Sequence, residues 1–510
     1  MSDGIVHLVG AGPGDPGLMT RRSLELIAAA DAILYDRLIP ADALEGARPD
    51  AELIYVGKAP GDVAMTQDGI NAKLVELGLG GRNVVRLKGG DSFVFGRGGE
   101  EAEDLRAAGV AFEVVPGVTS GVAAPAYAGI PVTHRDLASA VAFVTGHEDP
   151  EKGAKDSASL PNSSGGTKTA LDWDALARFP GTLVLYMGVK NLPTIAARLL
   201  EAGRPADHPA AVIQQGTLPT QRTATATLSG IAAEVAAQGI RAPAITVIGP
   251  AASMRDTLAW LERRPLHGRS VAVTRARAQA SGLAARLRTL GAEVVETPAI
   301  RIEPRPVPAE LADPSGYSLI CVTSPNGAHL LMDGLAANGL DARALHGATV
   351  AAIGPGTAKE LAARGIAPDV VPPRSIAESL VEALEAVPVD GKRVMVARAA
   401  EARDLLPDAL AERGALVDVV PLYDTVAEPL SEAQGTALEA ADYVTFTSSS
   451  TVRFLMEAAG TFPEHARLVS IGPVTSATAR EYGLEVHVEA VSHDIDGLVQ
   501  ALLNDVANRP

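Results

Sequence analysis

The first half of the chain is organised around the stretch Val84-Val85-Arg86-Leu87-Lys88-Gly89-Gly90-Asp91-Ser92-Phe93-Val94-Phe95-Gly96-Arg97-Gly98-Gly99-Glu100-Glu101. The apolar residues that open it have the length and β-branched content of a buried strand, and the glycine-rich turn leads into a helical pattern. In open α/β sheets, ligands bind beyond the carboxyl ends of the strands. Gly89 and Gly90 would let a flat ligand lie against bare backbone, and Asp91 can accept hydrogen bonds from its hydroxyl or ammonium groups. For a Gly-Gly-Asp taken alone, an ordinary turn between strand and helix is the alternative.

The composition limits the class of protein. A chain of 510 residues is too long for one core, and two to four domains are expected. With 47% hydrophobic and only 4% aromatic residues, it is typical of a soluble α/β protein. A net charge of −17 argues against nucleic acid or an anionic membrane as the main partner. Cys321 is the only cysteine, which excludes a disulfide framework and a cysteine-based metal site, and no other metal-chelating cluster is apparent. Without a signal peptide or a membrane-spanning apolar run in the sequence, we expect a cytoplasmic protein.

The loop Gly10–Gly17 follows a predicted strand, Ile5–Val9, and begins like a dinucleotide-binding fingerprint. It departs from that pattern because the third glycine comes one residue early and Asp15 occupies its expected position. Pro13 and Pro16 also remove backbone donors that a pyrophosphate site would use. The loop therefore predicts a nucleoside ligand that lacks phosphates.

Two charged residues follow neighbouring predicted strands. Asp36 comes after Ala32–Tyr35, and Lys58 comes after Leu53–Val56. Both side chains would lie on one rim of a sheet, where they can form an ion pair or an acid–base couple. A surface salt bridge is the alternative, and Asp36 also stands about where a dinucleotide-binding protein places its ribose-binding acid.

Further polar positions follow later strands of this half. Thr119 or Ser120 can cap the next helix and also face the crevice. Arg135 can contact an anionic substrate or take part in a structural hydrogen bond. Met187 can pack flat against an adenine or belong to the core. Segment 148–171 carries no periodicity and is predicted to be a mobile insertion.

The second half contains an internal repeat. Three stretches recur in order: Gly268–Ala276 as Gly391–Ala399, Ile320–Ser324 as Val444–Ser448, and Ile353–Thr357 as Ile471–Thr475. Each repeating unit has the pattern of a buried strand, a small polar turn and an amphipathic helix. The repeat predicts two similar lobes, each a parallel sheet between helices.

The turns of this repeat place hydroxyl groups at predicted helix N-termini. The hydroxyl residues are Thr323, Ser324, Thr357, Thr447, Ser448 and Thr475. Hydroxyls and backbone N–H groups at helix N-termini can make neutral anion sites, and plain N-capping is the alternative. The proline-rich segments 298–308 and 421–429 predict two crossings between the lobes that can hinge.

The first half resembles the uroporphyrinogen-III C-methyltransferases. Gly10–Gly17 and Val84–Glu101 match two signatures of that family, although Ser92 stands where the family usually has proline. The resemblance implies a two-subdomain tetrapyrrole methylase fold, S-adenosylmethionine as cofactor, and methylation at C2 and C7 to give precorrin-2. It also implies that Asp36 accepts a proton and that Lys58 donates one.

The same resemblance implies the binding residues of this half. Cofactor contacts are expected at Pro13, Gly89, Gly90, Asp91, Val94, Thr119, Ser120, Met187 and Gly216. Five basic residues are candidates to meet the carboxylates of an acidic substrate: Arg37, Arg86, Lys88, Arg97 and Arg135. Of these, Arg97 and Arg135 are selected as substrate-binding.

The second half resembles uroporphyrinogen-III synthase over nearly its whole length. The resemblance implies hinged lobes that exchange segments, no metal or cofactor, and hydroxymethylbilane as a substrate whose last pyrrole ring is inverted before ring closure. Tyr423 matches the suspected acid for hydroxyl departure, and a tyrosine that merely packs is the alternative. Thr357, Ser448 and Thr475 match polar positions of the substrate cleft.

Together the two resemblances predict a bifunctional enzyme of tetrapyrrole biosynthesis, on the route to cobalamin or sirohaem. The expected domains are a methyltransferase at 1–262, with subdomains at about 1–117 and 118–250, a linker at 263–268, and a synthase at 269–510. Lobe one would comprise about 269–298 and 427–510, and lobe two about 305–421. We expect tetrapyrrole substrates, no nucleic-acid or membrane partner, and a homodimer through the first half. The alternatives are a different precorrin methylase and a methylase fused to a non-catalytic tetrapyrrole-sensing module.

Overall fold

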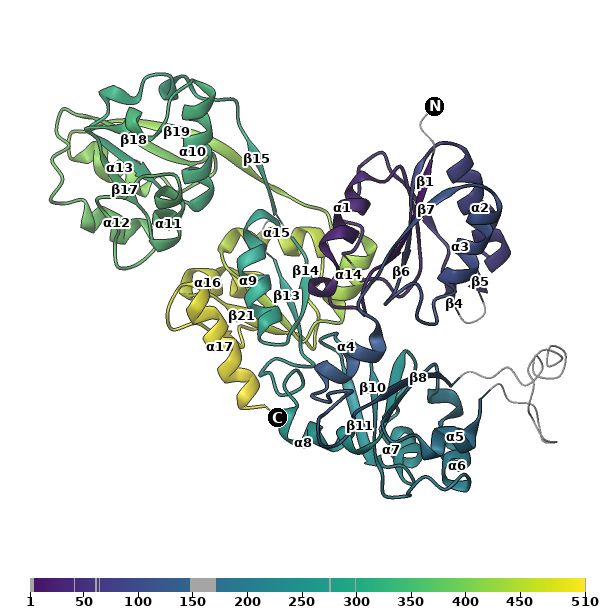
Figure 1. Cartoon of the computed structure of the whole chain (residues 1–510). Coiled ribbons are helices and arrows are strands. Elements are labelled where there is room, and N and C mark those ends of the chain that lie inside the picture. Colours follow the sequence, from purple (N-terminus) through teal and green to yellow (C-terminus); the bar gives the residue numbers. More distant parts are fainter. Residues whose placement is uncertain are drawn as a thin grey trace. The chain divides into compact units, whose positions relative to one another are not determined.

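The computed structural model describes residues 4–40, 42–59, 62–63, 65–146, 171–274, 277–298 and 300–509. The chain divides into two compact units, Met1–Gly268 and Arg269–Pro510. Each unit contains two five-stranded sheets with helices packed against them (Figure 1). The predicted insertion 148–171 lies, apart from its last residue, outside the described residues.

The first sheet of the first unit is wholly parallel, with strand order β3-β2-β6-β1-β7. Its strands are β1 (Ile5–Gly10), β2 (Ala32–Tyr35), β3 (Glu52–Tyr55), β6 (Asn83–Lys88) and β7 (Ala111–Val115). Helices α2 (Gln67–Leu79) and α3 (Gly98–Ala107) cover one face, and α1 (Arg21–Ala29) covers the other (Figure 1). The carboxyl ends of β1, β2, β6 and β7 therefore meet at one edge, where α/β proteins bind ligands.

The second sheet of this unit is mixed, with strand order β11-β10-β12-β9-β8. Its strands are β8 (Val141–Thr145), β9 (Thr182–Tyr186), β10 (Pro209–Gln214), β11 (Arg222–Thr227) and β12 (Ala244–Ile248). Helices α4 (Ser120–Tyr127), α5 (Trp173–Arg178), α6 (Leu192–Glu201) and α7 (Ile231–Ala237) belong to this part, and β4 (Lys58–Ala59) pairs with β5 (Asp62–Val63) elsewhere. The last helix of this unit, α8, covers Arg255–Leu258. Trp260, beyond its end, packs its ring against that of Tyr127.

The first sheet of the second unit confirms the predicted parallel arrangement, with strand order β14-β13-β20-β21-β22. Its strands are β13 (Ser270–Val273), β14 (Glu293–Glu296), β20 (Tyr443–Phe446), β21 (Arg467–Ser470) and β22 (Val488–Glu489). The helices are α9 (Arg277–Thr289), α14 (Glu432–Glu439), α15 (Ser449–Ala459), α16 (Pro473–Glu481) and α17 (Ile495–Ala507). The start of this unit thus pairs with its end, because β13 lies beside β20.

The second sheet of this unit has strand order β15-β19-β18-β16-β17. Its strands are β15 (Ile300–Pro304), β16 (Leu319–Val322), β17 (Thr349–Ala352), β18 (Arg393–Ala399) and β19 (Leu416–Ala427), with helices α10 (Pro325–Ala337), α11 (Pro355–Ala363), α12 (Ala377–Ala383) and α13 (Leu405–Glu412). The prediction of a purely parallel sheet is wrong here, since β15 runs antiparallel to β19. The chain leaves the first sheet along β15 and returns along the end of β19, so the two crossings run in opposite directions and pair.

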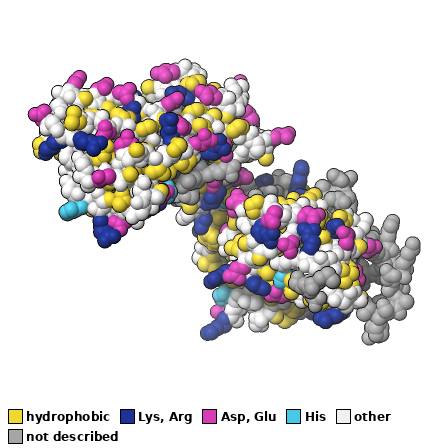
Figure 2. Space-filling model, turned by 90° about the horizontal axis from the view of Figure 1, so that it is seen from above, with side chains coloured by type: hydrophobic (Ala, Val, Ile, Leu, Met, Phe, Trp, Pro, Cys, Tyr) yellow, Lys and Arg dark blue, Asp and Glu magenta, His cyan; other side chains and the backbone are white. Residues whose placement is uncertain are grey.

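Two further features concern the polarity of the helices and the distribution of charge on the surface. Within the described ranges, every helix is too short or too polar to cross a membrane. On the face that Figure 2 shows, acidic and basic side chains are interspersed with hydrophobic ones. Neither sign of charge is gathered into a single patch on this face.

Candidate functional site

Three loops of the first unit meet backbone against backbone at the carboxyl edge of the first sheet. Gly12 N–H donates to the Gly90 carbonyl at 3.1 Å, and Gly90 N–H donates to the Gly12 carbonyl at 2.6 Å. A Cβ at Gly117 would lie 2.2 Å from the Gly90 oxygen, and one at Gly10 would lie 2.5 Å from Gly117 N. Only glycine fits this approach, so the loops after β1, β6 and β7 form one surface of bare backbone, which we call the glycine floor.

Asp91 joins two of these loops. Its Oδ2 accepts from Gly117 N at 3.0 Å, and its Oδ1 accepts from Phe93 N at 2.8 Å. Gly89, two residues earlier, has no room for a side chain, because a Cβ would lie 2.5 Å from the Leu38 carbonyl oxygen. The backbone bonds orient the Asp91 carboxylate, and the second lone pair of each oxygen remains a possible acceptor for a ligand.

The second sheet of the first unit contributes turns with unusual backbone geometry. Met187, Gln215 and Thr217 have φ values of 56°, 48° and 78°. Such left-handed conformations in residues other than glycine cost energy and cluster at functional sites. Met187 is 53% exposed, so the core alternative for this residue is wrong. Gly216 lies between two of these residues and packs closely on α4, since a Cβ there would lie 2.3 Å from Ala124 Cβ.

A tyrosine that the sequence analysis did not select connects the floor to this second part. The Tyr186 hydroxyl lies 2.7 Å from Thr119 Oγ1 and accepts from Gly121 N at 2.8 Å. Thr119 is the N-cap residue of α4, one of the two positions predicted, but its side chain makes no cap hydrogen bond and its hydroxyl meets Tyr186 instead. Burial raises the pKa of Tyr186, which keeps its phenol neutral.

Two further expected cofactor residues lie near these turns. Pro13 is half-buried between Gly12 and Gly14 in the loop after β1. Val94 packs against the core cluster of the second part, which includes Tyr186. Both lie within the unit that carries the floor.

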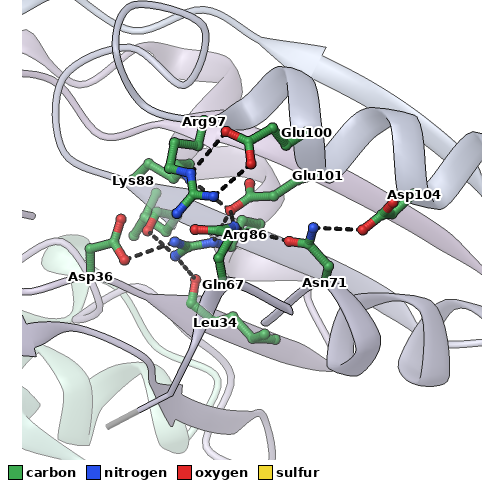
Figure 3. Close-up of polar contacts among 11 residues, drawn as sticks. Leu34, Asp36, Gln67, Asn71, Arg86, Lys88, Arg97, Glu100, Glu101 and Asp104 are labelled. Atoms are coloured by element: carbon green, nitrogen blue, oxygen red, sulfur yellow. Dashed lines mark hydrogen bonds and ion pairs between the residues drawn. The ribbon is translucent and has the colours of Figure 1, made fainter. Parts of the chain in front are cut away.

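Asp36 directly follows β2 and is held by a buried cluster of charges (Figure 3). Its Oδ1 accepts from Arg86 Nη2 at 2.8 Å, and Arg86 is 2% exposed. Arg86 Nε, Lys88 Nζ and Gln67 Nε2 all donate to Glu101 Oε1, at 3.2, 2.7 and 3.1 Å. Asp36 thus pairs with Arg86, and its predicted pairing with Lys58 stays a prediction, because the Lys58 side chain lies outside the described residues.

The burial of this cluster corrects two expectations. Arg86 and Lys88 are committed to Glu101 inside the protein, so neither is available for a substrate carboxylate. Burial, followed by the nearby charge of Arg86, lowers the pKa of Lys88, while Glu101 opposes the shift. The two arginines selected as substrate-binding are not buried in this way. The Arg97 side chain is 47% exposed and pairs with Glu100 at 2.6 Å, and Arg135 is exposed.

The second unit holds its candidate residues on two sheets. Tyr423 lies in β19, is 5% exposed, and places its hydroxyl 2.9 Å from Ser324 Oγ. Burial raises the pKa of Tyr423. Ser324 and Ser448 cap α10 and α15 by accepting from Gly327 N at 2.8 Å and Thr451 N at 3.3 Å. For these two serines, the alternative of plain N-capping is therefore confirmed.

Thr357 and Thr475 occupy equivalent places in the first turns of α11 and α16. They are 2% and 4% exposed. The structure therefore buries both threonines at the helix starts where the repeat placed them. In the parts of the chain that the structure describes, no three His, Cys, Asp or Glu side chains are grouped so as to hold a metal ion.

Two family models match the chain. Residues 6–232 match the Tetrapyrrole (Corrin/Porphyrin) Methylases, and residues 281–500 match Uroporphyrinogen-III synthase HemD. The chain is 36% identical to the Porphyrin biosynthesis protein HemD of Ruminiclostridium josui, over 99% of this chain and 98% of that protein. It is 43% identical to the Uroporphyrinogen-III C-methyltransferase of Bacillus subtilis, over 76% of this chain and 77% of that protein. The solved Uroporphyrin-III C-methyl transferase of Thermus thermophilus complexed with S-adenyl homocysteine is 37% identical, covering 49% of this chain and 98% of that one, with a TM-score of 0.39.

The fold, the glycine floor and these matches define a fusion enzyme of tetrapyrrole biosynthesis, in which a methylase precedes a synthase. The chain belongs to the family represented by the whole-length relative from Ruminiclostridium josui, and both resemblances drawn from the sequence are confirmed.

Proposed function

We propose that the second unit cyclises hydroxymethylbilane to uroporphyrinogen III with inversion of the last ring, and that the first unit methylates this product at C2 and C7 to give precorrin-2. The glycine floor carries the proposal for the first unit. It brings the bare backbone of three loops together beside the carboxylate of Asp91, which two backbone hydrogen bonds orient. The name of the relative from Bacillus subtilis, a uroporphyrinogen-III C-methyltransferase, supports the choice of substrate.

S-adenosylmethionine is the proposed cofactor, and its sulfonium supplies the methyl group. The residues present fit a nucleoside: a Cβ at Gly90 would have no atom nearer than Ser120 N at 3.8 Å, so the backbone there has room for a flat base or ribose, and Asp91 accepts hydrogen bonds. Met187, which is 53% exposed, offers an apolar side chain for stacking against a base. Pro13, Val94, Thr119, Ser120 and Gly216 complete the proposed contacts. The transfer is a displacement, so this unit contributes chiefly by orienting the reactants and excluding water.

Asp36 is the proposed proton acceptor of the methyl transfer. Transfer of a methyl cation to a substituted pyrrole carbon leaves the ring system positively charged, so the ring must release a proton, for example from its N–H, and a carboxylate at the strand edge can take it up. Arg86 occupies one oxygen of Asp36 at 2.8 Å, which fixes the side chain while leaving it 28% exposed. Lys58 is the proposed donor, and Arg97 and Arg135 are proposed to meet substrate carboxylates.

Replacing Tyr186 with phenylalanine is expected to weaken S-adenosylhomocysteine binding about fivefold to tenfold. The change removes the hydroxyl that joins Thr119 Oγ1 to Gly121 N, and one buried hydrogen bond is worth about 1 kcal/mol. Isothermal titration calorimetry on the full chain measures the change. Tyr55→Phe, at a tyrosine that is 43% exposed, is the control. Equal affinity in Tyr186→Phe and the native chain would show that the hydroxyl does not shape the site.

In the second unit, Tyr423 is the proposed acid for hydroxyl departure. Its raised pKa keeps the phenol protonated, as a general acid requires. Tyr423→Phe is expected to slow formation of uroporphyrinogen III by about 100-fold, the lower end of the usual effect of a general acid. The measurement is the yield of inverted against uninverted macrocycle from hydroxymethylbilane. Tyr482→Phe, at an exposed tyrosine, is the control, and an unchanged rate in Tyr423→Phe would leave that residue a packing role only.

The whole proposal is tested by incubating the full chain with hydroxymethylbilane, with and without S-adenosylmethionine, and identifying the products. Uroporphyrinogen III is expected without the cofactor, and precorrin-2 with it. Ring closure at the uncatalysed rate would make the second unit a sensing module. Methylation of a later precorrin but not of uroporphyrinogen III would define a different methylase. A homodimer through the first unit is also proposed, and sedimentation equilibrium measures it.

A further inference from the structure

The last segment of the first unit, Arg255–Gly268, leads into the second unit, and we call it the joining segment. It lies outside both regions matched by family models, 6–232 and 281–500. It nevertheless contains the centre of a polar network. Glu262 Oε1 accepts from Gln221 Nε2 at 2.9 Å and from Thr223 Oγ1 at 2.6 Å. Glu262 Oε2 accepts from Arg255 Nη2 at 2.6 Å. One carboxylate of the joining segment thus receives three hydrogen bonds, one from Thr223 in β11 and one from Gln221 just before that strand.

The network continues from Glu262 to the turns of the proposed cofactor site. Gln221 is fully buried, and its Oε1 accepts from Thr217 N at 2.9 Å. The Thr217 hydroxyl in turn accepts from Asp15 N at 3.0 Å. A continuous path of hydrogen bonds therefore runs from Glu262 through Gln221 and Thr217 to Asp15, in the loop after β1.

Thr217 is the member of this path that most needs support. It is β-branched and has a φ of 78°, a conformation in which such a residue is an outlier. Strained backbone of this kind persists only where its surroundings enforce it. The amide of Thr217 is held by Gln221 and its hydroxyl by Asp15, so both restraints depend on this network.

A second contact path leads from the same segment to Asp15. The Tyr127 hydroxyl donates to Asp15 Oδ2 at 2.6 Å. The Tyr127 ring lies 4.9 Å from the ring of Trp260, whose Nε1 donates to the Ala126 carbonyl at 3.0 Å. Two independent routes thus connect the joining segment with the loop Gly10–Gly17.

We propose that Glu262 and Gln221 are positioning residues that hold the Gln215–Thr217 turn and the Asp15 loop in the shape that binds the nucleoside cofactor. The joining segment then sets cofactor affinity without touching the cofactor. This inference rests on the proposed cofactor site.

The test uses Glu262→Gln in the full chain, which keeps the size of the side chain and removes its charge. S-adenosylhomocysteine is expected to bind about tenfold more weakly, because hydrogen bonds to a charged acceptor are the stronger class. The KM for S-adenosylmethionine should rise with it, while kcat for methyl transfer and the KM for uroporphyrinogen III stay within about twofold. Asp256→Asn, at an exposed acid of the same segment, is the matched control. The synthase activity of the same molecules reports their concentration and integrity.

A second variant separates positioning from general loss of stability. Gln221→Leu interrupts the same path of hydrogen bonds. The double variant, with Glu262→Gln and Gln221→Leu, should therefore bind S-adenosylhomocysteine no more weakly than the single variant with the larger loss of affinity. Additive weakening, a fall in kcat with unchanged KM, or native affinity in Glu262→Gln would each overturn the inference. If the native chain itself fails to bind S-adenosylhomocysteine, the proposed cofactor site is wrong and the inference falls with it.

Discussion

Replacing Asp36 with asparagine is expected to slow methyl transfer by about 100- to 10,000-fold, the usual contribution of a general base. Asparagine has nearly the shape of aspartate, and its oxygen can still accept from Arg86 Nη2, which lies 2.8 Å from Asp36 Oδ1. The change therefore removes the proton acceptor while the strand edge keeps its geometry. Single-turnover methylation of uroporphyrinogen III at saturating cofactor measures the effect.

Three comparisons make the Asp36 result decisive. Asp42→Asn, at an exposed acid in the next loop, should retain the native rate. S-adenosylhomocysteine affinity and the synthase activity of Asp36→Asn should also be native, because neither depends on this proton acceptor. A methylation rate within threefold of native in Asp36→Asn would remove Asp36 from the proposed chemistry.

The second large effect is expected at Glu101. Its Oε1 accepts from three donors, and two of them, on Arg86 and Lys88, are buried cations. Glu101→Gln leaves Lys88 without its buried counter-charge and leaves Arg86 with Asp36 alone, and breaking a buried pair in this way costs about 3–5 kcal/mol of unfolding free energy. Calorimetric unfolding of the full chain measures this loss of unfolding free energy. The transition of the first unit is identified as the one whose midpoint S-adenosylhomocysteine shifts. Glu103→Gln, at an exposed position of the same helix, should unfold as the native chain does.

The pH dependence of Glu101→Gln has a defined sign. Burial, and then Arg86, already lowers the pKa of Lys88 below its ordinary value of 10.5, and Glu101 is the main opposing influence. In the variant, the unfolded chain binds a proton at Lys88 that the folded chain releases more readily. Stability should therefore rise as pH increases towards 10.5, by at most about 1.4 kcal/mol per pH unit. Adding Lys88→Met should abolish that slope, and a slope that survives would assign it to another group.

Local sequence patterns were sufficient to predict an element wherever a short run of neighbouring residues determines it. Ala32–Tyr35 is apolar, short and β-branched enough to be read as a buried strand, and β2 has those bounds. The glycine-rich turn after β6 was recognised because a close approach of backbones requires glycine at fixed places in the chain. The predicted strands also placed Asp36 and Asp91 after strand ends, and the parallel sheet of the structure brings those ends to one edge. The repeat in the second half likewise predicted two similar sheets.

Pairings between distant residues were not readable in this way. Arg86 and Lys88 have the alternating positions of an ordinary strand, and nothing local distinguishes a surface arginine from one that meets Glu101. Tyr186 looked like the last residue of a buried strand, although its hydroxyl reaches Thr119, 67 residues away. The antiparallel direction of the edge strand β15 could not be predicted either, because it depends on how the distant strand β19 runs back beside it.

The sequence by itself determined the elements, the glycine turns, the duplication and the family, because each of these is written in neighbouring residues or in a repeated order. The tertiary structure alone decided which charges neutralise one another, which hydroxyls pair, and how Glu262 reaches the turn at Thr217. Those outcomes depend on distances between residues far apart in the chain, and burial gives such contacts their strength by removing the water that would otherwise compete for them.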